Sequence, residues 1–279
     1  LFGIRGMAAY AYHAMVLDFW DDEVAQFFRR ALFALGEDWG MDELLPLALE
    51  VGERNLACRT REIFIGSGAR VEMVESCRLN ARSSLISASY ARQQGDSVLH
   101  GVSVGLSAGL MRNEQTVLLE GRGAENHTNG LTIAGEQEHL DFATDIEHIA
   151  SDCTSYQLFK GLAADGGTSV FSGRIYVAQD AQRTQAFQQN NNLLLSDDAH
   201  VYAKPQLEIY ADNVKCSHGA TVGQLDPEAI YYMRQRGIGL EDARRLQMYG
   251  FVLDVLGESR VQEMNELFDR EIASKIEGL

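Results

Sequence analysis

Short apolar triplets, each followed by a polar turn that closes on alanine, recur through the middle of this chain. Ile63-Phe64-Ile65 precedes GSGA, Val117-Leu118-Leu119 precedes EGRGA, Ile175-Tyr176-Val177 precedes AQDA, and Leu193-Leu194-Leu195 precedes SDDA. The last two triplets start eighteen residues apart, but the other intervals are irregular, so the repeat is degenerate. Many short strands separated by turn signals are typical of a sandwich, a barrel or a solenoid.

The triplets favour the solenoid among these architectures. A short strand followed by a small turn suits stacked coils, because each coil buries its inner face against its neighbours. The polar run QQNNN at residues 188–192 fits as well, since stacked amide side chains hydrogen-bond along such a structure. We therefore expect a mainly β protein with a parallel β-helix core over residues 58–225, and a β-sandwich is the alternative.

Helical patterns flank this core on both sides. Residues 21–36 place apolar side chains at helical spacing behind two aspartates, which predicts a small helical cap over residues 1–57. Asp226-Pro227-Glu228 is a good helix start, so residues 226–279 are expected to form a C-terminal helical domain. Its last segment has one predicted apolar stripe, made of Val261, Met264, Phe268 and Ile272.

The charge balance limits the partners of this protein. The formal net charge is −16, with 40 acidic against 24 basic residues. Such a charge repels phosphate backbones, so no nucleic-acid partner is expected. No apolar run approaches the roughly 20 residues that cross a bilayer, so no membrane partner is expected either.

The spacing of the cysteines and the absence of common motifs narrow the possible functional class of this protein. The four cysteines are widely spaced and form no CxxC, so we expect a reduced, cytoplasmic protein in which Cys58, Cys77 and Cys153 are mostly buried thiols. The sequence contains no GxxxxGK[ST], HExxH or GxSxG. It therefore has no P-loop for ATP and none of the familiar hydrolase signatures.

Cys216 and His218 alternate within DNVKCSHGATVGQLD (212–226), which reads as a strand that leads into a helix. Side chains two apart in a strand share a face, so this thiol and imidazole are expected to project together, opposite Lys215. The pair suits iron, zinc or copper, and the Lys215 charge is expected to favour the thiolate. Because two ligands are too few for a structural site, further ligands would come from another chain or a distant segment. A core role for both residues remains the alternative.

A second polar stretch, QEHLDFATDIEH (137–148), brings His139, Asp141, Asp145 and His148 close in sequence. Their spacing matches no familiar metal motif. The polar face of a strand ladder is the preferred interpretation, with a metal cluster as the alternative.

Two longer runs carry a family resemblance. They are GRIYVAQDAQRTQAFQQNNNLLLSDDAHVYAKPQLEIYADNVKCSHGATVGQLD (173–226) and HLDFATDIEHIASDCTSYQLFKG (139–161). Both closely resemble the SufB/SufD family of iron–sulfur cluster assembly scaffolds, and KCSHGATVGQLD resembles the SufD branch of that family. The resemblance is strong over residues 117–256 and weaker before them.

The resemblance implies a right-handed parallel β-helix between helical domains, and a scaffold without catalytic activity of its own. It implies SufB as the partner at the end that carries Cys216 and His218, and the ABC-type ATPase SufC as the partner of residues 226–279. His218 is then the expected ligand of a cluster at the interface, with Cys216 supporting it. A transient iron–sulfur cluster or iron would be shared with SufB, with none held tightly by the isolated chain.

The C-terminal domain also needs exposed residues to bind an ATPase. Tyr231, Met248 and Phe251 are expected to be these residues, and Met248→Asp or Phe251→Asp is expected to weaken binding without unfolding the chain. Two other functions remain open: a β-solenoid enzyme of a carbohydrate-active or transferase type, and a purely structural homodimer. No acidic pair has a spacing that demands acid–base catalysis, and strict hexapeptide repeats are missing.

Overall fold

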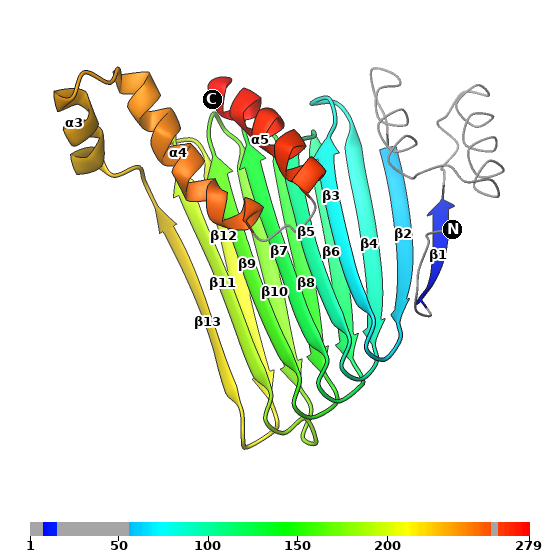
Figure 1. Ribbon diagram of the computed structural model, residues 1–279. Helices are drawn as coiled ribbons and strands as arrows, with labels where there is room; N and C mark the ends of the chain where they lie inside the picture. Colours follow the sequence, from blue (N-terminus) through cyan, green and yellow to red (C-terminus); the bar gives the residue numbers. More distant parts are fainter. Residues whose placement is uncertain (1–7, 16–55, 258–261) are drawn as a thin grey trace, which may run out of the picture.

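The computed structural model describes residues 8–15, 56–257 and 262–279, and it shows a parallel β-solenoid crossed by C-terminal helices (Figure 1). Each coil gives one strand to each of two sheets. The seven-stranded sheet contains β1 (Ala8–Met15), β2 (Leu56–Ile65), β4 (Ser84–Gln93), β6 (Leu110–Leu119), β8 (His139–His148), β10 (Thr168–Val177) and β12 (His200–Ile209). The six-stranded sheet contains β3 (Arg70–Arg78), β5 (Val98–Ser107), β7 (Glu125–Ala134), β9 (Thr154–Ala163), β11 (Gln185–Leu194) and β13 (Lys215–Gly223). The expectation of a mainly β, parallel β-helix core is confirmed.

The apolar triplets end strands whose side chains alternate between the interior and the outer face. In β10 the first and third triplet residues, Ile175 and Val177, are fully buried, whereas Tyr176 between them points outward. Ile175 pairs in register with Ile146 of β8, which pairs with Val117 of β6, so equivalent residues stack through the coils. Burying such a side chain is worth about 1.5–3 kcal/mol, which is why this column sets the register of the coils.

The degenerate repeat has a simple structural origin. The triplet at Ile175 ends a strand of the seven-stranded sheet, and the triplet at Leu193 overlaps the end of β11 in the other sheet. Their interval therefore separates two strands of one coil, whereas equivalent positions in successive coils, such as Arg112 and Asp141, lie 29 residues apart. Several of the alanines that close the turns, including Ala124 and Ala181, are buried at the corners of the coils.

The N-terminal part differs from its expectation where the structure describes it. Residues 8–15, placed in the predicted helical cap, form strand β1, which pairs antiparallel with β2. The helix predicted over residues 21–36 lies outside the described residues.

Three helices follow the last strand in the described part of the chain: α3 (Pro227–Gln235), α4 (Leu240–Leu256) and α5 (Gln262–Glu277). Asp226 caps α3 by accepting a hydrogen bond at Oδ1 from the Glu228 amide. Helices α4 and α5 lie across the six-stranded sheet, where Val252 and Phe268 pack with Leu131 in one buried cluster (Figure 1). In the predicted apolar stripe, Phe268 and Ile272 are buried, and the side chains of Val261 and Met264 are outside the described residues.

Candidate functional site on the terminal strand

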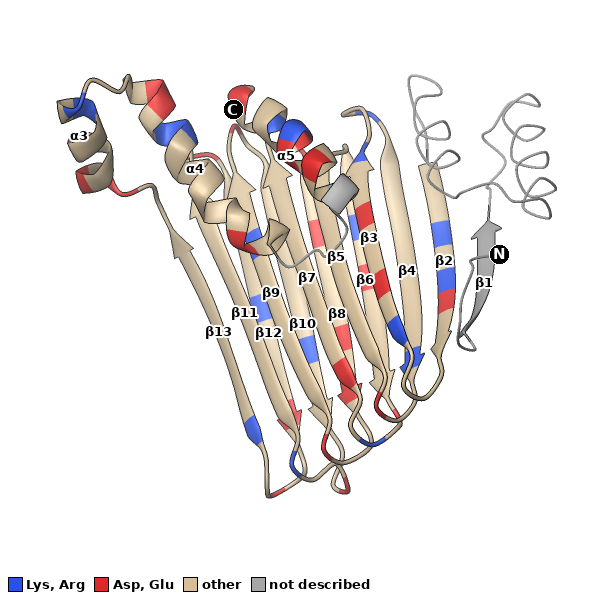
Figure 2. Cartoon of the chain, in the orientation of Figure 1, with Lys and Arg blue, Asp and Glu red and all other residues tan. Residues whose placement is uncertain are grey.

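Strand β13 is the last strand of the six-stranded sheet and lies at the open end of the solenoid (Figure 1). Along its length it pairs with β11, and its other edge carries no described strand. Lys215 is its single charged residue, so the strand is almost free of charge (Figure 2). The end of the solenoid therefore offers a nearly neutral backbone edge for another chain to contact.

The register of β13 fixes which side chains face the interior. Cys216 pairs with Ala186 and His218 pairs with Gln188, and both of these β11 residues are buried. Ser217 pairs with Phe187, whose ring stacks on the outward-facing Tyr156 at a centroid distance of 5.3 Å. Cys216 and His218 thus share the inner face of the last coil, in agreement with the strand alternation.

No described coil covers Cys216 or His218, but the two side chains differ in exposure. Cys216 is half-buried and packs against the core cluster that contains Ala186, whereas His218 is exposed. Burial raises the pKa of the Cys216 thiol, an effect that the Ala186 backbone partly opposes. The expectation that Lys215 favours the thiolate is wrong for this chain, because Lys215 lies on the opposite face of the strand and desolvation dominates.

The side chains at this end carry two donor types that soft metals prefer. Thiol and imidazole fit iron, but within the described residues no group of three His, Cys, Asp or Glu side chains is arranged to hold a metal ion. Cys216 and His218 can therefore supply two ligands at most, and the remaining ligands of any site would have to approach from beyond the solenoid end.

Gln188 lies next to His218 on the neighbouring strand, and the sequence analysis did not identify it as a residue of the candidate site. Its side chain is buried at 3% exposure. The polar run QQNNN pointed to this strand, but stacked amides were expected to pair along the solenoid. The strand alternation instead sends Gln188, Asn190 and Asn192 inward, while Gln189 and Asn191 face outward.

The polar stretch at residues 137–148 does not gather into a site. His148 is fully buried inside the solenoid, where its Nε2 lies 2.8 Å from Ser155 Oγ. Asp141 is buried at 6% exposure and pairs with Arg112, and the half-buried Asp145 pairs with Arg174. The preferred interpretation, a polar ladder, describes these residues better than a metal cluster, although His148 Nδ1 and Asp141 Oδ1 have no hydrogen-bond partner among the described residues, so the ladder is only partly satisfied.

The other cysteines behave as structural thiols. All four cysteines are free. Cys77 and Cys153 are buried, as expected, and burial raises the pKa of the Cys77 thiol to about 12. Cys58 is half-buried on β2 and so is less enclosed than expected. Cys77 and Cys153 are enclosed within the solenoid, whereas Cys216 is half-buried in the last coil beside the exposed His218, so Cys216 is the better placed of these three thiols to reach a ligand from outside.

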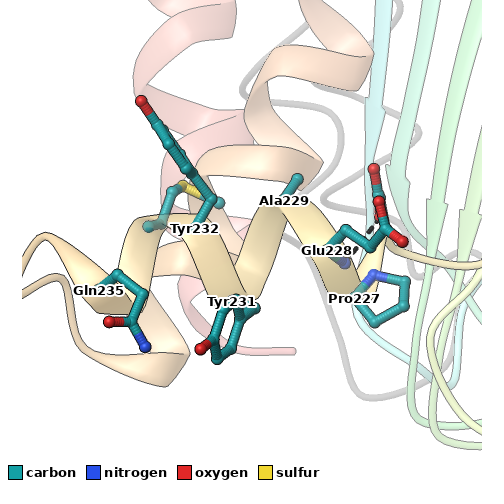
Figure 3. A pocket seen from close by; sticks show the side chains of 8 residues that line it. Pro227, Glu228, Ala229, Tyr231, Tyr232 and Gln235 are labelled. Atoms are coloured by element: carbon teal, nitrogen blue, oxygen red, sulfur yellow. Dashed lines mark hydrogen bonds between the residues drawn. The ribbon is translucent and has the colours of Figure 1, made fainter.

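The three predicted docking residues lie in different environments. Tyr231 is 65% exposed on α3, a helix without any buried residue, and it projects beside Gln235 from one side of that helix (Figure 3). Met248 is only 6% exposed and belongs to the cluster beneath α4, so its predicted exposure is wrong. Phe251 is half-buried, with its ring 4.6 Å from Lys160 Nζ. Sequence periodicity did not show which turn of α4 faces the sheet.

The described residues also include no helix that is both long and apolar enough to cross a membrane.

Comparisons with known proteins agree on one family. The family described as "SUF system FeS cluster assembly, SufBD core domain" matches residues 22–251. The iron–sulfur cluster assembly protein SufD of Escherichia coli is 39% identical over 173 residues, which is 62% of this chain and 41% of that protein. A SufBD family protein of Synechocystis is 36% identical over 71% of this chain and 44% of its own length. SufD of Bacillus subtilis is 30% identical over 67% of this chain and 44% of its own length, so each match spans less than half of the relative.

Proposed function

The chain belongs to the SufBD core-domain family of the SUF iron–sulfur cluster assembly system, and from this premise we propose that it is a non-catalytic, SufD-type scaffold. It presents Cys216 and His218 to a SufB-type partner at the end of the solenoid. Its C-terminal helices bind a SufC-type ATPase. The cargo is a nascent iron–sulfur cluster, or iron, that is shared with the SufB-type chain.

The position of His218 carries this proposal. The residue lies on the inner face of the last coil, so its imidazole is open to solvent only because the solenoid ends there. An interior-facing ligand in any earlier coil would be enclosed by the coil above it. A partner that docks on β13 would therefore enclose His218 and complete its ligand set.

The surroundings of β13 support a protein partner at this end. One backbone edge of β13 pairs with no strand in the described part of the chain, and Tyr202 and Val222 are exposed on the two last strands. An exposed edge with apolar side chains is the kind of surface that another strand or solenoid end covers. The nearly neutral character of β13 also avoids the cost of burying unpaired charges.

The C-terminal helices support the second partner. Helix α3 lies apart from the two sheets, and its tyrosines Tyr231 and Tyr232 are both exposed (Figures 1 and 3). Leu246 and Leu253 are exposed on the outer side of α4. Exposed tyrosines on a helix without buried residues are typical of a protein-binding surface, because Tyr gives a large contact area at low entropic cost. The absence of a P-loop from the sequence fits a scaffold whose ATP is hydrolysed by its partner.

Anaerobic co-purification of the tagged chain with its partners, followed by iron and sulfide analysis, tests this function. We expect a β-solenoid relative and an ABC-type ATPase in the complex. His218→Ala is expected to lower its iron and sulfide content several-fold, and Cys216→Ala to lower it less. Ser217→Ala, on the opposite face of the same strand, is the matched control and should leave the content unchanged. Recovery of the chain without partners, or equal iron in His218→Ala, would contradict the proposal.

Self-association is the second candidate function. The open end that suits a SufB-type chain also suits a second copy of this chain, because β12 and β13 each end a sheet. Sedimentation of the purified chain, first alone and then with the SufB-type partner, distinguishes the two cases. A dimer that persists when the SufB-type partner is added in excess would favour the structural homodimer.

A further inference from the structure

Directly below His218, the amide of Gln188 is buried without a hydrogen-bond partner. Gln188 pairs in register with His218 and is 3% exposed. Neither its Nε2 nor its Oε1 has a hydrogen-bond partner among the residues that the structure describes. A buried amide without partners costs roughly 1–3 kcal/mol for each unsatisfied group. Such an amide in a folded chain therefore calls for a structural or functional explanation.

The neighbouring amides of this inner face each have at least one hydrogen-bond partner. On the same inner face of β11, Asn192 donates to Asn190 Oδ1 at 2.7 Å and to the Thr221 carbonyl at 3.2 Å. One coil below, Gln157 Oε1 accepts a hydrogen bond from Thr144 at 2.8 Å, although Gln157 Nε2 has no partner among the described residues. Gln188 differs from these neighbours because both of its amide atoms lack a partner there.

A glycine on the facing strand makes room for this amide. Gly173 of β10 lies across the interior, and a Cβ atom there would fall 2.4 Å from Gln188 Nε2. A contact that short would displace the amide group. Gly173 therefore leaves the space in which the Gln188 side chain lies, next to the last coil.

From this juxtaposition we propose that Gln188 is the positioning residue for His218. When His218 binds iron, Gln188 Oε1 accepts a hydrogen bond from one ring N–H, and the other ring nitrogen is left to bind the metal. Neighbouring strands lie about 4.8 Å apart, so Gln188 and His218, which are in register on one face, are direct neighbours. The inference rests on the proposed function, since it assigns His218 as the ligand.

The chemistry of histidine ligands gives this contact its role. A metal-bound imidazole usually donates its second ring N–H to a carbonyl or carboxylate, which selects the tautomer and fixes the ring plane. The Gln188 carbonyl would do this from below, where the interior excludes water. Loss of such a partner typically weakens metal binding by about 10- to 100-fold.

The test uses the complex of this chain with its SufB-type and ATPase partners, loaded anaerobically with iron and sulfide. Four variants are compared with the parent: Gln188→Leu, Gln188→Glu, Gln189→Leu and His218→Ala. Gln188→Glu keeps an acceptor oxygen at the same position. Gln189→Leu makes the same exchange one residue along β11, on the outward face, and is the matched control. Two quantities are measured: iron retention against a chelator, and the ¹⁴N hyperfine couplings of a bound imidazole in the reduced complex by pulsed EPR.

We expect Gln188→Leu to retain iron about 10- to 100-fold more weakly and to change the imidazole couplings. Gln188→Glu and Gln189→Leu should resemble the parent, and His218→Ala should abolish the imidazole signal. If His218→Ala abolishes the signal but Gln188→Leu matches the parent, the inference on Gln188 is overturned and the proposed function stands. An equal loss in Gln189→Leu would also overturn it. If His218→Ala keeps the imidazole signal, the assignment of His218 fails, and the inference fails with it.

Discussion

The Nζ atom of Lys160 lies 2.5 Å from Asp254 Oδ2 and joins strand β9 to helix α4. The same ammonium group donates to the Phe251 carbonyl at 2.7 Å and lies 4.6 Å from the centre of the Phe251 ring. The Lys160 side chain is 6% exposed and that of Asp254 is 69% exposed. Because Asp254 is largely in solvent, its ion pair is screened, and the charged hydrogen bond to the carbonyl is the larger contribution.

Lys160→Met is expected to lower the free energy of unfolding by about 1.5–3 kcal/mol, the usual value of a hydrogen bond from a charged group. The methionine fills a similar volume, so the loss reports the polar contacts of α4. Urea denaturation followed by circular dichroism measures it. Lys204→Met on β12, where the lysine is exposed, is the control and should change stability by less than about 0.5 kcal/mol. Equal stability of both variants would contradict this assignment.

Tyr231→Asp is expected to weaken ATPase binding at least several-fold without changing the melting temperature, because the side chain is exposed on α3. Titration of the purified ATPase against the chain by calorimetry checks the affinity. Met248→Asp serves as the contrast: a carboxylate in the cluster beneath α4 should destabilise the chain by several kcal/mol. Unchanged affinity in Tyr231→Asp would exclude this part of α3 from the docking surface.

The buried imidazole of His148 predicts a pH dependence of stability. Desolvation lowers its pKa from 6.5 to about 4 in the folded chain. Between these values the unfolded chain binds a proton that the folded chain does not, so the free energy of unfolding falls as the pH falls from 6.5 to 4. The full effect is about 3 kcal/mol, and the contribution of this group is constant above pH 6.5.

Replacement of His148 by Gln tests this directly. The difference in stability between the parent and His148→Gln should change over the interval from pH 6.5 to pH 4, in favour of the variant at low pH. His139→Gln, at the outward-facing start of the same strand, should keep the slope of the parent. Parallel pH profiles for the parent and His148→Gln would be inconsistent with a neutral buried imidazole.

Gln188→Leu is expected to leave the isolated chain as stable as the parent or more stable, since it removes a buried amide without partners. Asn192→Leu is the contrast, because it removes hydrogen bonds to Asn190 and Thr221 and should lower the melting temperature. Thermal unfolding of both variants measures the difference. A clear loss of stability in Gln188→Leu would mean that its amide is satisfied in the free chain.

The sequence predicted the architecture because the period-two alternation and the turns are local properties of the chain. Ile175 and Val177 face inward for the reason that the triplet suggested, and Cys216 and His218 share a face for the same reason. The coil register was not predictable from the intervals alone, since the strands of two sheets alternate along the chain. It depends on which apolar residues stack, and that is a property of the assembled coils.

The candidate site was predictable only in part. The strand and its two candidate ligands follow from KCSHG, but the unsatisfied amide of Gln188 depends on the residues that surround it in three dimensions. The burial of Met248 was missed for a similar reason: α4 has apolar residues on several sides, and only its packing on the sheet selects the buried one.

Helices α4 and α5 pack chiefly on β5, β7 and β9, so they brace the middle coils of the solenoid. Mechanically, the coil of β12 and β13 is then the free end of a clamped beam. A load applied there bends the last rungs most, and the braced coils change least. Because α3 follows β13 after only a short connection, a torque on that helix reaches the strand of Cys216 and His218 without first passing through the braced core.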